Sequence, residues 1–221
     1  MTVDVTLIAD PRVLCVPIDE RGDALVELGD SMSLRLDLRK RDANPDFCLA
    51  REGLAQRLLE ARDRLPEGLA LVVVEGYRPI DLQARYFDKY CRELLVLHPD
   101  WSDDLVRATA SRFVSPPDSL PPHSTGGAID LTLSTDDGEE LDMGTPVNAS
   151  PEESQGACYT SAQGISGKAA RNRGLLMGAM GAAGLVNYPT EWWHWSYGDR
   201  YWAYMLGKRS ALFGAVLSPR R

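Results

Sequence analysis

The chain has 221 residues, a formal net charge of -8 and a pI near 4.9. This length is enough for one core, and we expect a single domain over residues 1–221. The acidic balance argues against a basic phosphate-binding surface, so we expect no nucleic-acid partner.

The N-terminal residues and the cysteines bear on the compartment. Residues 1–5 show no basic segment followed by a long apolar run, so neither a signal peptide nor a membrane span is expected. Cys15, Cys48, Cys91 and Cys158 lack the paired spacing of structural zinc sites or redox motifs, and we expect buried thiols. These features indicate a cytoplasmic protein without a membrane partner; a homo-oligomer stays open.

The first predicted elements are a helix and a strand. Apolar residues recur every three or four positions over 49–65, which predicts an amphipathic helix ended by Pro66 and Gly68. The β-branched run 69–74 predicts a buried strand. The segment that follows, 76–79, is thereby delivered to a strand end.

Two further helices and a loop are expected next. Residues 80–97 are predicted helical up to the proline after His98, and a second helix is predicted over 102–113. Four prolines within 115–122 predict an extended loop, which leads directly to His123.

The second half of the chain is predicted to supply another strand and helix. Alternation over 128–133 places Ile129 and its alternate neighbours toward the core and Asp130 on the other face. Residues 142–167 are predicted to form a loop or lid, and 172–185 a helix of small residues. The predicted fold class is α+β, a mostly antiparallel sheet flanked by helices.

His123 and Asp130 are the first candidate site residues. A single histidine in such a loop is more often solvated or a hydrogen-bonded cap. Gly126 and Gly127 change this expectation, because they let the backbone fold back between the histidine and the strand-borne aspartate. Both side chains could then reach one ion at about 2.0–2.2 Å.

Glu191 and His194 lie in the run Glu-Trp-Trp-His-Trp. The three tryptophans also suit a core or an interface patch. A regular strand would point residues three apart to opposite faces, so cooperation requires a turn or kink, which Pro189 favours. The spacing differs from the helix-borne His-Glu-x-x-His zinc motif. Arg78, at its strand end, could hold a carboxylate or polarise a carbonyl.

These motifs resemble the zinc-dependent D-alanyl-D-alanine dipeptidases of the VanX type, relatives of D,D-carboxypeptidases, over about residues 36–207. Residues 75–79 resemble the family's Asp-Gly-Tyr-Arg-Pro segment, with Glu75 for Asp. Residues 123–133 resemble its first zinc-binding run, 142–145 its loop motif, and 191–195 its last catalytic motif.

The resemblance implies a D,D-peptidase-like zinc fold with one Zn²⁺ per chain. It implies His123, Asp130 and His194 as zinc ligands, Glu191 as catalytic base and Arg78 as electrostatic stabiliser. Such a ligand set keeps an open position where water is activated. Glu191 would take the proton of that water and return it to the leaving amine.

The substrate pocket departs from the family pattern. Pro121 stands where the family usually has a serine that helps to hold substrate, and neutral Asn148 stands where it has an aspartate near the substrate ammonium. Losing that charge should weaken ammonium binding. Tyr77 and Ser124 are further candidate substrate contacts, although packing and turn formation explain them equally well.

Three functions follow from these residues. The first is hydrolysis of a small dipeptide such as D-Ala-D-Ala, from the cell wall. The second is a repurposed family member that acts on a modified amino acid or peptide in a biosynthetic pathway, which Pro121 and Asn148 favour. The third, a non-catalytic binding protein, is disfavoured because every residue needed for hydrolysis is present.

Overall fold

The structure is a computed structural model that describes residues 5–216, apart from the side chain of Asp30. Its strands are β1 Leu25–Glu27, β2 Arg35–Leu36, β3 Leu49–Arg51, β4 Leu69–Glu75, β5 Ala128–Thr135, β6 Val186–Asn187 and β7 His194–Ser196. Its α-helices are α1 Pro11–Leu14, α2 Glu52–Arg62, α3 Ile80–Leu97, α4 Asp103–Ala110, α5 Pro122–Thr125, α6 Pro151–Ser154, α7 Gly167–Ala182 and α8 Arg200–Met205. Its 3-10 turns are η1 Asp30–Met32, η2 Leu38–Lys40 and η3 Pro117–Ser119.

A five-stranded sheet with the order β2-β4-β5-β7-β6 forms the centre of the molecule. β2 pairs with β4 in parallel, and the other neighbours pair antiparallel, so the sheet is mixed. β1 and β3 form a separate antiparallel pair. The predicted α+β class with a mostly antiparallel sheet is confirmed.

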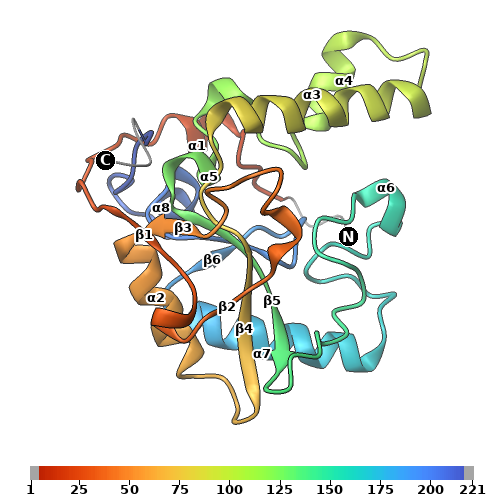
Figure 1. Ribbon diagram of the computed structural model, residues 1–221. Coiled ribbons are helices and arrows are strands. Elements are labelled where there is room, and N and C mark those ends of the chain that lie inside the picture. Colours follow the sequence, from red (N-terminus) through yellow and green to blue (C-terminus); the bar gives the residue numbers. More distant parts are fainter. Residues whose placement is uncertain (1–4, 217–221) are drawn as a thin grey trace.

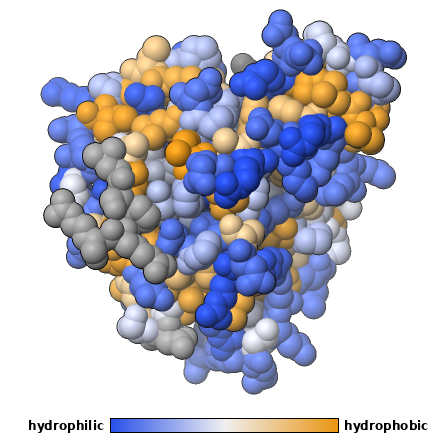
Figure 2. Space-filling view, turned by 45° about the horizontal axis from the view of Figure 1, so that its top comes forward, coloured by the Kyte–Doolittle hydropathy of each residue, from blue (hydrophilic) through white to orange (hydrophobic). Residues whose placement is uncertain are grey.

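The long strands β4 and β5 run side by side through the molecule, and α3 and α4 project from one end as an arm (Figure 1). Figure 2 shows a hydrophobic patch on this arm among hydrophilic residues. Val96 and Leu97 at the end of α3 are exposed. No helix in the described range is both long and apolar enough to cross a membrane.

The main core lies against the sheet. Apolar residues of β4 and β5 pack there with side chains from α2 and α7 and with the three tryptophans of 191–195. The strand β5 is buried on both faces over residues 128–134, because the face that carries Asp130 is covered as well. Asp130 therefore points to the other face of β5 from Ile129, as the alternation predicts, yet it is only 2% exposed.

The predicted strand 69–74 and the predicted helices 80–97 and 102–113 correspond to β4, α3 and α4, with a shorter α4 that continues in a turn. The segment 142–166 is irregular except for the single turn of α6, as expected, and residue 167 of the predicted loop already belongs to α7. The strand and the two helices have strong local signals, an apolar run, helical periodicity or proline stops, which explains their agreement.

Three element predictions were wrong in detail. The predicted helix 49–65 begins with β3, because residues 49–51 pair with β1 before α2 starts. The predicted extended loop 115–122 contains η3 and the first residue of α5, since proline suits the first turn of a helix. The predicted helix 172–185 is α7, which starts earlier because Ser166 caps it.

The expectation of buried thiols holds for Cys48 and Cys158. It was wrong for Cys15, which is exposed, and Cys91 is intermediate. The short helix α1 next to Cys15 buries Val13 instead, so the thiol is left at the surface.

Candidate metal centre

Strand register brings three ionisable residues into one row. Asp130 of β5 pairs with Glu75 of β4 on one side and with His194 of β7 on the other. Directly opposed residues of antiparallel strands point to the same face of a sheet, so their side chains are neighbours. The row faces away from the main core, and all three residues are buried.

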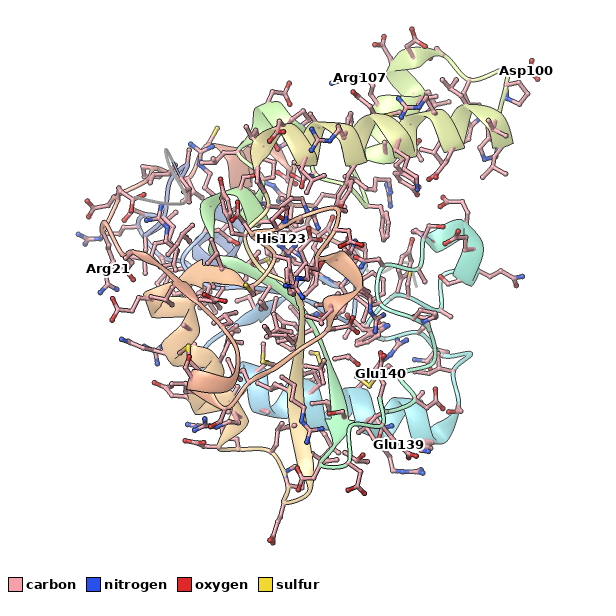
Figure 3. All side chains as sticks on the ribbon, in the orientation of Figure 1. Arg21, Asp100, Arg107, His123, Glu139 and Glu140 are labelled. Atoms are coloured by element: carbon pink, nitrogen blue, oxygen red, sulfur yellow. The ribbon has the colours of Figure 1, made fainter. Side chains whose placement is uncertain are left out.

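His123 joins this row from α5, the helical turn that precedes β5, near the middle of the molecule (Figure 3). Its Nδ1 lies 2.7 Å from the carbonyl oxygen of Gly76. A carbonyl only accepts, so Nδ1 carries the proton and Nε2 presents a lone pair to the centre. Position 76 requires glycine, because a Cβ there would strike the carbonyl oxygen of Leu49.

The donor atoms of His123, Asp130 and His194 converge within 4.8 Å of one another. His123 Nε2 lies 3.2 Å from His194 Nδ1 and 3.4 Å from Asp130 Oδ1, and His194 Nδ1 lies 3.1 Å from the same oxygen. Ligands at about 2.0–2.1 Å from a tetrahedral ion are about 3.3 Å apart. The three buried donors therefore fit zinc with a fourth position open.

Glu191 stands beside these donors on the turn before β7. The Glu191 amide donates to the Tyr188 carbonyl, and the His194 amide to the Glu191 carbonyl, which gives the turn that cooperation of the two residues requires. Glu191 is 8% exposed and lines the cavity that opens beside these donors. Burial, reinforced by the charge of Asp130, raises the pKa of Glu191 well above its usual value.

Arg78 is anchored by side chains from two elements. Its Nε and Nη2 donate to the two carboxylate oxygens of Glu75 at 3.1 and 2.6 Å, and its Nη1 donates to Gln83 of α3 at 2.8 Å. Nη2 also lies 3.8 Å from Asp130. Asn44 donates to Glu75 as well, at 3.0 Å. The guanidinium is thereby held rigidly at the edge of the cavity.

Burial and neighbouring charges shift the pKa values of the site residues in opposite directions. Burial opposes ionisation of Glu75, but the charge and hydrogen bonds of Arg78 outweigh it and lower the Glu75 pKa. Burial likewise opposes ionisation of Asp130, yet His123 and His194 hold its pKa well below the usual value. For His194 burial dominates and lowers the pKa. A carboxylate and a neutral imidazole are the forms that bind a metal ion.

A cavity of about 470 Å³ opens in front of these residues. The candidates that line it are Arg78, Pro121, His123, Asp130, Asn148, Glu191 and His194. Tyr77 is buried, and Ser124 donates to the Arg78 carbonyl at 2.8 Å; neither belongs to the cavity lining. Their roles as substrate contacts therefore remain predictions without support from this cavity.

The cavity also has a wall that the motifs did not reveal. Gln83, Tyr86 and Tyr90 of α3 line it, together with Lys40 of η2. The three α3 residues recur at helical spacing and mix aromatic with polar character, a signal that was present in the sequence. Lys40 follows no recognisable motif, and only the fold brings it here.

Comparison with solved structures gives distant matches. One is a vancomycin-resistance D,D-pentapeptidase VanY with Zn(II), at 16% identity and a TM-score of 0.48, covering 89% of this chain and 96% of that one. Another is the LD-carboxypeptidase LdcB, at 19% identity and a TM-score of 0.47, covering 94% of this chain and 89% of that one.

Sequence comparison is more direct. The D-ala-D-ala dipeptidase family signature matches residues 35–208. A D-alanyl-D-alanine dipeptidase of Synechocystis sp. is 31% identical over 180 residues, covering 72% of this chain and 73% of the relative. One from Enterococcus faecium is 32% identical over 151 residues, covering 64% and 69%. The chain belongs to the D-Ala-D-Ala dipeptidase family of zinc metallopeptidases.

Proposed function

We propose that this chain, acting as a single domain, is a zinc-dependent dipeptidase that hydrolyses D-Ala-D-Ala or a closely similar free dipeptide. The observation that carries the proposal is the convergence of three buried donors at one side of a cavity that Glu191 and Arg78 also line. The family membership supports the same reaction.

In this proposal His123, Asp130 and His194 hold one zinc ion per chain. When bound, zinc supplies a Lewis acid that polarises the scissile carbonyl and activates water at neutral pH. Two features favour metal binding by these histidines. The Gly76 carbonyl fixes the tautomer of His123, and burial lowers the pKa of His194, which favours its neutral form.

Glu191 is proposed as the general base. Its carboxylate removes a proton from the attacking water and then delivers that proton to the nitrogen of the leaving amino acid. The raised pKa supports this second step, because a carboxyl group with a raised pKa is a better proton carrier near neutral pH.

Arg78 is proposed to stabilise the negative charge that develops on the carbonyl oxygen. Its anchoring by Glu75 and Gln83 supports this role, since a group that is already oriented does not need to reorganise during the reaction. Arg78 carries its charge at all relevant pH values, because Glu75 outweighs the effect of burial and raises its pKa.

A second candidate is a family member that acts on a modified amino acid or peptide. The cavity lining favours it at two positions, where Pro121 offers no hydroxyl and Asn148 offers no negative charge for a substrate ammonium. In that case zinc and Glu191 would serve the same acid–base chemistry on a different substrate.

The deciding experiment incubates zinc-loaded protein with L,L, L,D, D,L and D,D dipeptides and measures the released amino acids. We expect cleavage of D,D-dipeptides that is lost in Glu191→Gln. A zinc-replete protein that cleaves none of the dipeptides would overturn the dipeptidase and favour the second candidate.

A further inference from the structure

A buried polar cluster lies behind His194, at the junction of β7 and α8. His194 and Ser196 are alternate residues of β7 and share one face. The chain then turns at Gly198, whose φ of +79 and close contact with the ring of Phe213 exclude a side chain. Asp199 follows and caps α8, because its Oδ1 accepts from the Trp202 amide at 2.8 Å.

Four polar atoms of this cluster lack a hydrogen-bond partner within residues 5–216. They are His194 Nε2, Ser196 Oγ, Asp199 Oδ2 and Tyr201 OH. Each belongs to a buried residue, and Asp199 is 1% exposed. Buried polar atoms are nearly always satisfied, by protein or by ordered water, so four in one cluster require an explanation.

The orientation of His194 explains part of this cluster of unpaired polar atoms. Its Nδ1 faces Asp130 and His123, so in the metal-binding form the proton lies on Nε2. That buried N–H needs an acceptor. A carboxylate is the strongest acceptor in the cluster. Asp199 Oδ1 caps α8, and the carboxylate also interacts with Ser196, which places it beside the β7 face that carries His194.

The electrostatics agree with this pairing. Burial dominates the pKa of both groups. At His194 the main opposing influence is Asp130, and the charge of Asp199 adds a smaller one; at Asp199 the interactions with Ser196 and the Trp202 amide oppose burial, and the charge of His194 adds to them. No direct ion pair joins the two side chains within the described part of the chain. A water molecule is the natural link, because a buried water needs two to four polar partners, and this cluster offers four.

We propose that Asp199 is a positioning residue for the metal centre, which holds the Nε2–H of His194 through one buried water shared with Ser196 and Tyr201. The proposal rests on the ligand set of the proposed function. By fixing the tautomer and ring orientation of His194, a carboxylate in this position increases the basicity of the ligating nitrogen. Asp199 thus serves both α8 and the metal ligand.

The two roles of Asp199 can be separated by substitution. Asp199→Asn keeps an oxygen that can cap α8 but removes the negative charge. Asp199→Ser keeps a favourable capping residue whose side chain is too short for the cluster. Ser102→Ala is the control, since it removes a comparable cap from α4, on the projecting arm.

The measurements are the zinc dissociation constant, by competition with a chromogenic chelator, and thermal unfolding of the metal-free proteins. We expect zinc binding to weaken about 10- to 100-fold in both Asp199 variants and to stay within about twofold in Ser102→Ala. The visible spectrum of the Co²⁺-substituted Asp199→Asn protein should also shift, because the ligand field changes.

Wild-type zinc affinity in folded Asp199→Asn and Asp199→Ser would overturn the proposal, even if α8 were destabilised, and would leave Asp199 as a helix cap. If Asp199→Ser does not fold, Asp199→Asn decides alone. No substrate is needed, so the outcome is separate from that of the dipeptide panel. A protein that binds zinc in this way but cleaves no dipeptide would contradict only the proposed function.

Discussion

Two of the walls of the cavity, the sheet wall and the wall that carries Asn148, are held in place by different means. One wall carries Asp130 and His194, which stand in register with each other and with Glu75 on three hydrogen-bonded strands. On the other, Asn148 lies in the irregular segment 142–166, where backbone ladders are largely missing. The first wall is positioned by the sheet, whereas the second depends on side chains.

Arg173 of α7 is the main side chain that holds the second wall. Its guanidinium donates to the backbone carbonyls of Met143, Ala157 and Tyr159 at 2.7–2.8 Å. Burial lowers the pKa of Arg173 to about 10, so it remains charged at neutral pH. One buried cation thus ties three points of the segment to a helix that lies under the sheet.

This difference suggests that chemistry and recognition can change separately in this protein. Moving a donor of the sheet wall would require a change of register, which flips every side chain of a strand. Changing Asn148 or the position of its segment requires single substitutions. The intact donor set beside an altered recognition wall is consistent with this view. The following predictions test it, from the largest expected effect to the smallest.

Loss of one of the three converging donors should have the largest effect. His123→Ala, Asp130→Ala and His194→Ala should each abolish stoichiometric zinc binding and lower turnover by at least about 10³-fold, because the open zinc site needs all three donors. Zinc content after dialysis and dipeptide turnover are the measurements. Full zinc retention in any one variant would remove that residue from the ligand set.

Glu191→Gln should retain zinc and lose about 10²- to 10⁴-fold in kcat, because an amide cannot carry the proton. Equilibrium dialysis with zinc and steady-state kinetics separate the two effects. A variant that keeps wild-type turnover would exclude Glu191 as the general base, and one that loses zinc would assign it to the metal site.

The same substitution should stabilise the metal-free protein at neutral pH. The folded-state pKa of Glu191 is raised, so its favourable contribution is present below the unfolded value of 4.5 and is lost as pH rises through the higher folded value. The Tm of metal-free Glu191→Gln should therefore exceed that of the wild type at pH 7, and the difference should shrink below pH 4.5. Equal Tm values at pH 7 would contradict the raised pKa.

Arg173→Met should destabilise the second wall. Three backbone carbonyls, one buried and two partly buried, would lose their donor, which should lower the free energy of unfolding by about 2–4 kcal/mol and raise KM, with little change in zinc affinity. Urea unfolding and kinetics check this, with the exposed Arg171→Met as the matched control. An equal loss of zinc affinity would show that the two walls are not independent.

Asn148→Asp should have the smallest effect and the opposite sign. Both residues tolerate the positive φ of 65 found at this position, so the backbone should be kept. The new charge should lower KM for free dipeptides by about 3- to 10-fold. N-acetylated dipeptides, which lack the ammonium, should show no gain, and an equal gain with both substrates would contradict an ammonium contact.

The local order of the chain was largely predictable from the sequence. The β-branched run that ends before Arg78, the helical periodicity of α3 and the alternation around Asp130 are signals within one segment, and each matches the structure. The segment 49–51 shows the limit. Its sequence resembles the start of a helix, but it forms a strand because it pairs with β1. A local pattern does not reveal this pairing, since β1 lies elsewhere in the sequence.

The sequence by itself determined the chemistry available to this protein: two histidines, two carboxylates and an arginine in recognisable motifs, and hence the family. Tertiary structure alone decided that Asp130 pairs with Glu75 and His194, that Arg173 holds the wall of Asn148, and that Asp199 is buried within the electrostatic influence of His194. The reason is physical. Residue type fixes what a side chain can donate or accept, whereas register and burial, which arise from contacts between distant segments, fix its neighbours and its pKa.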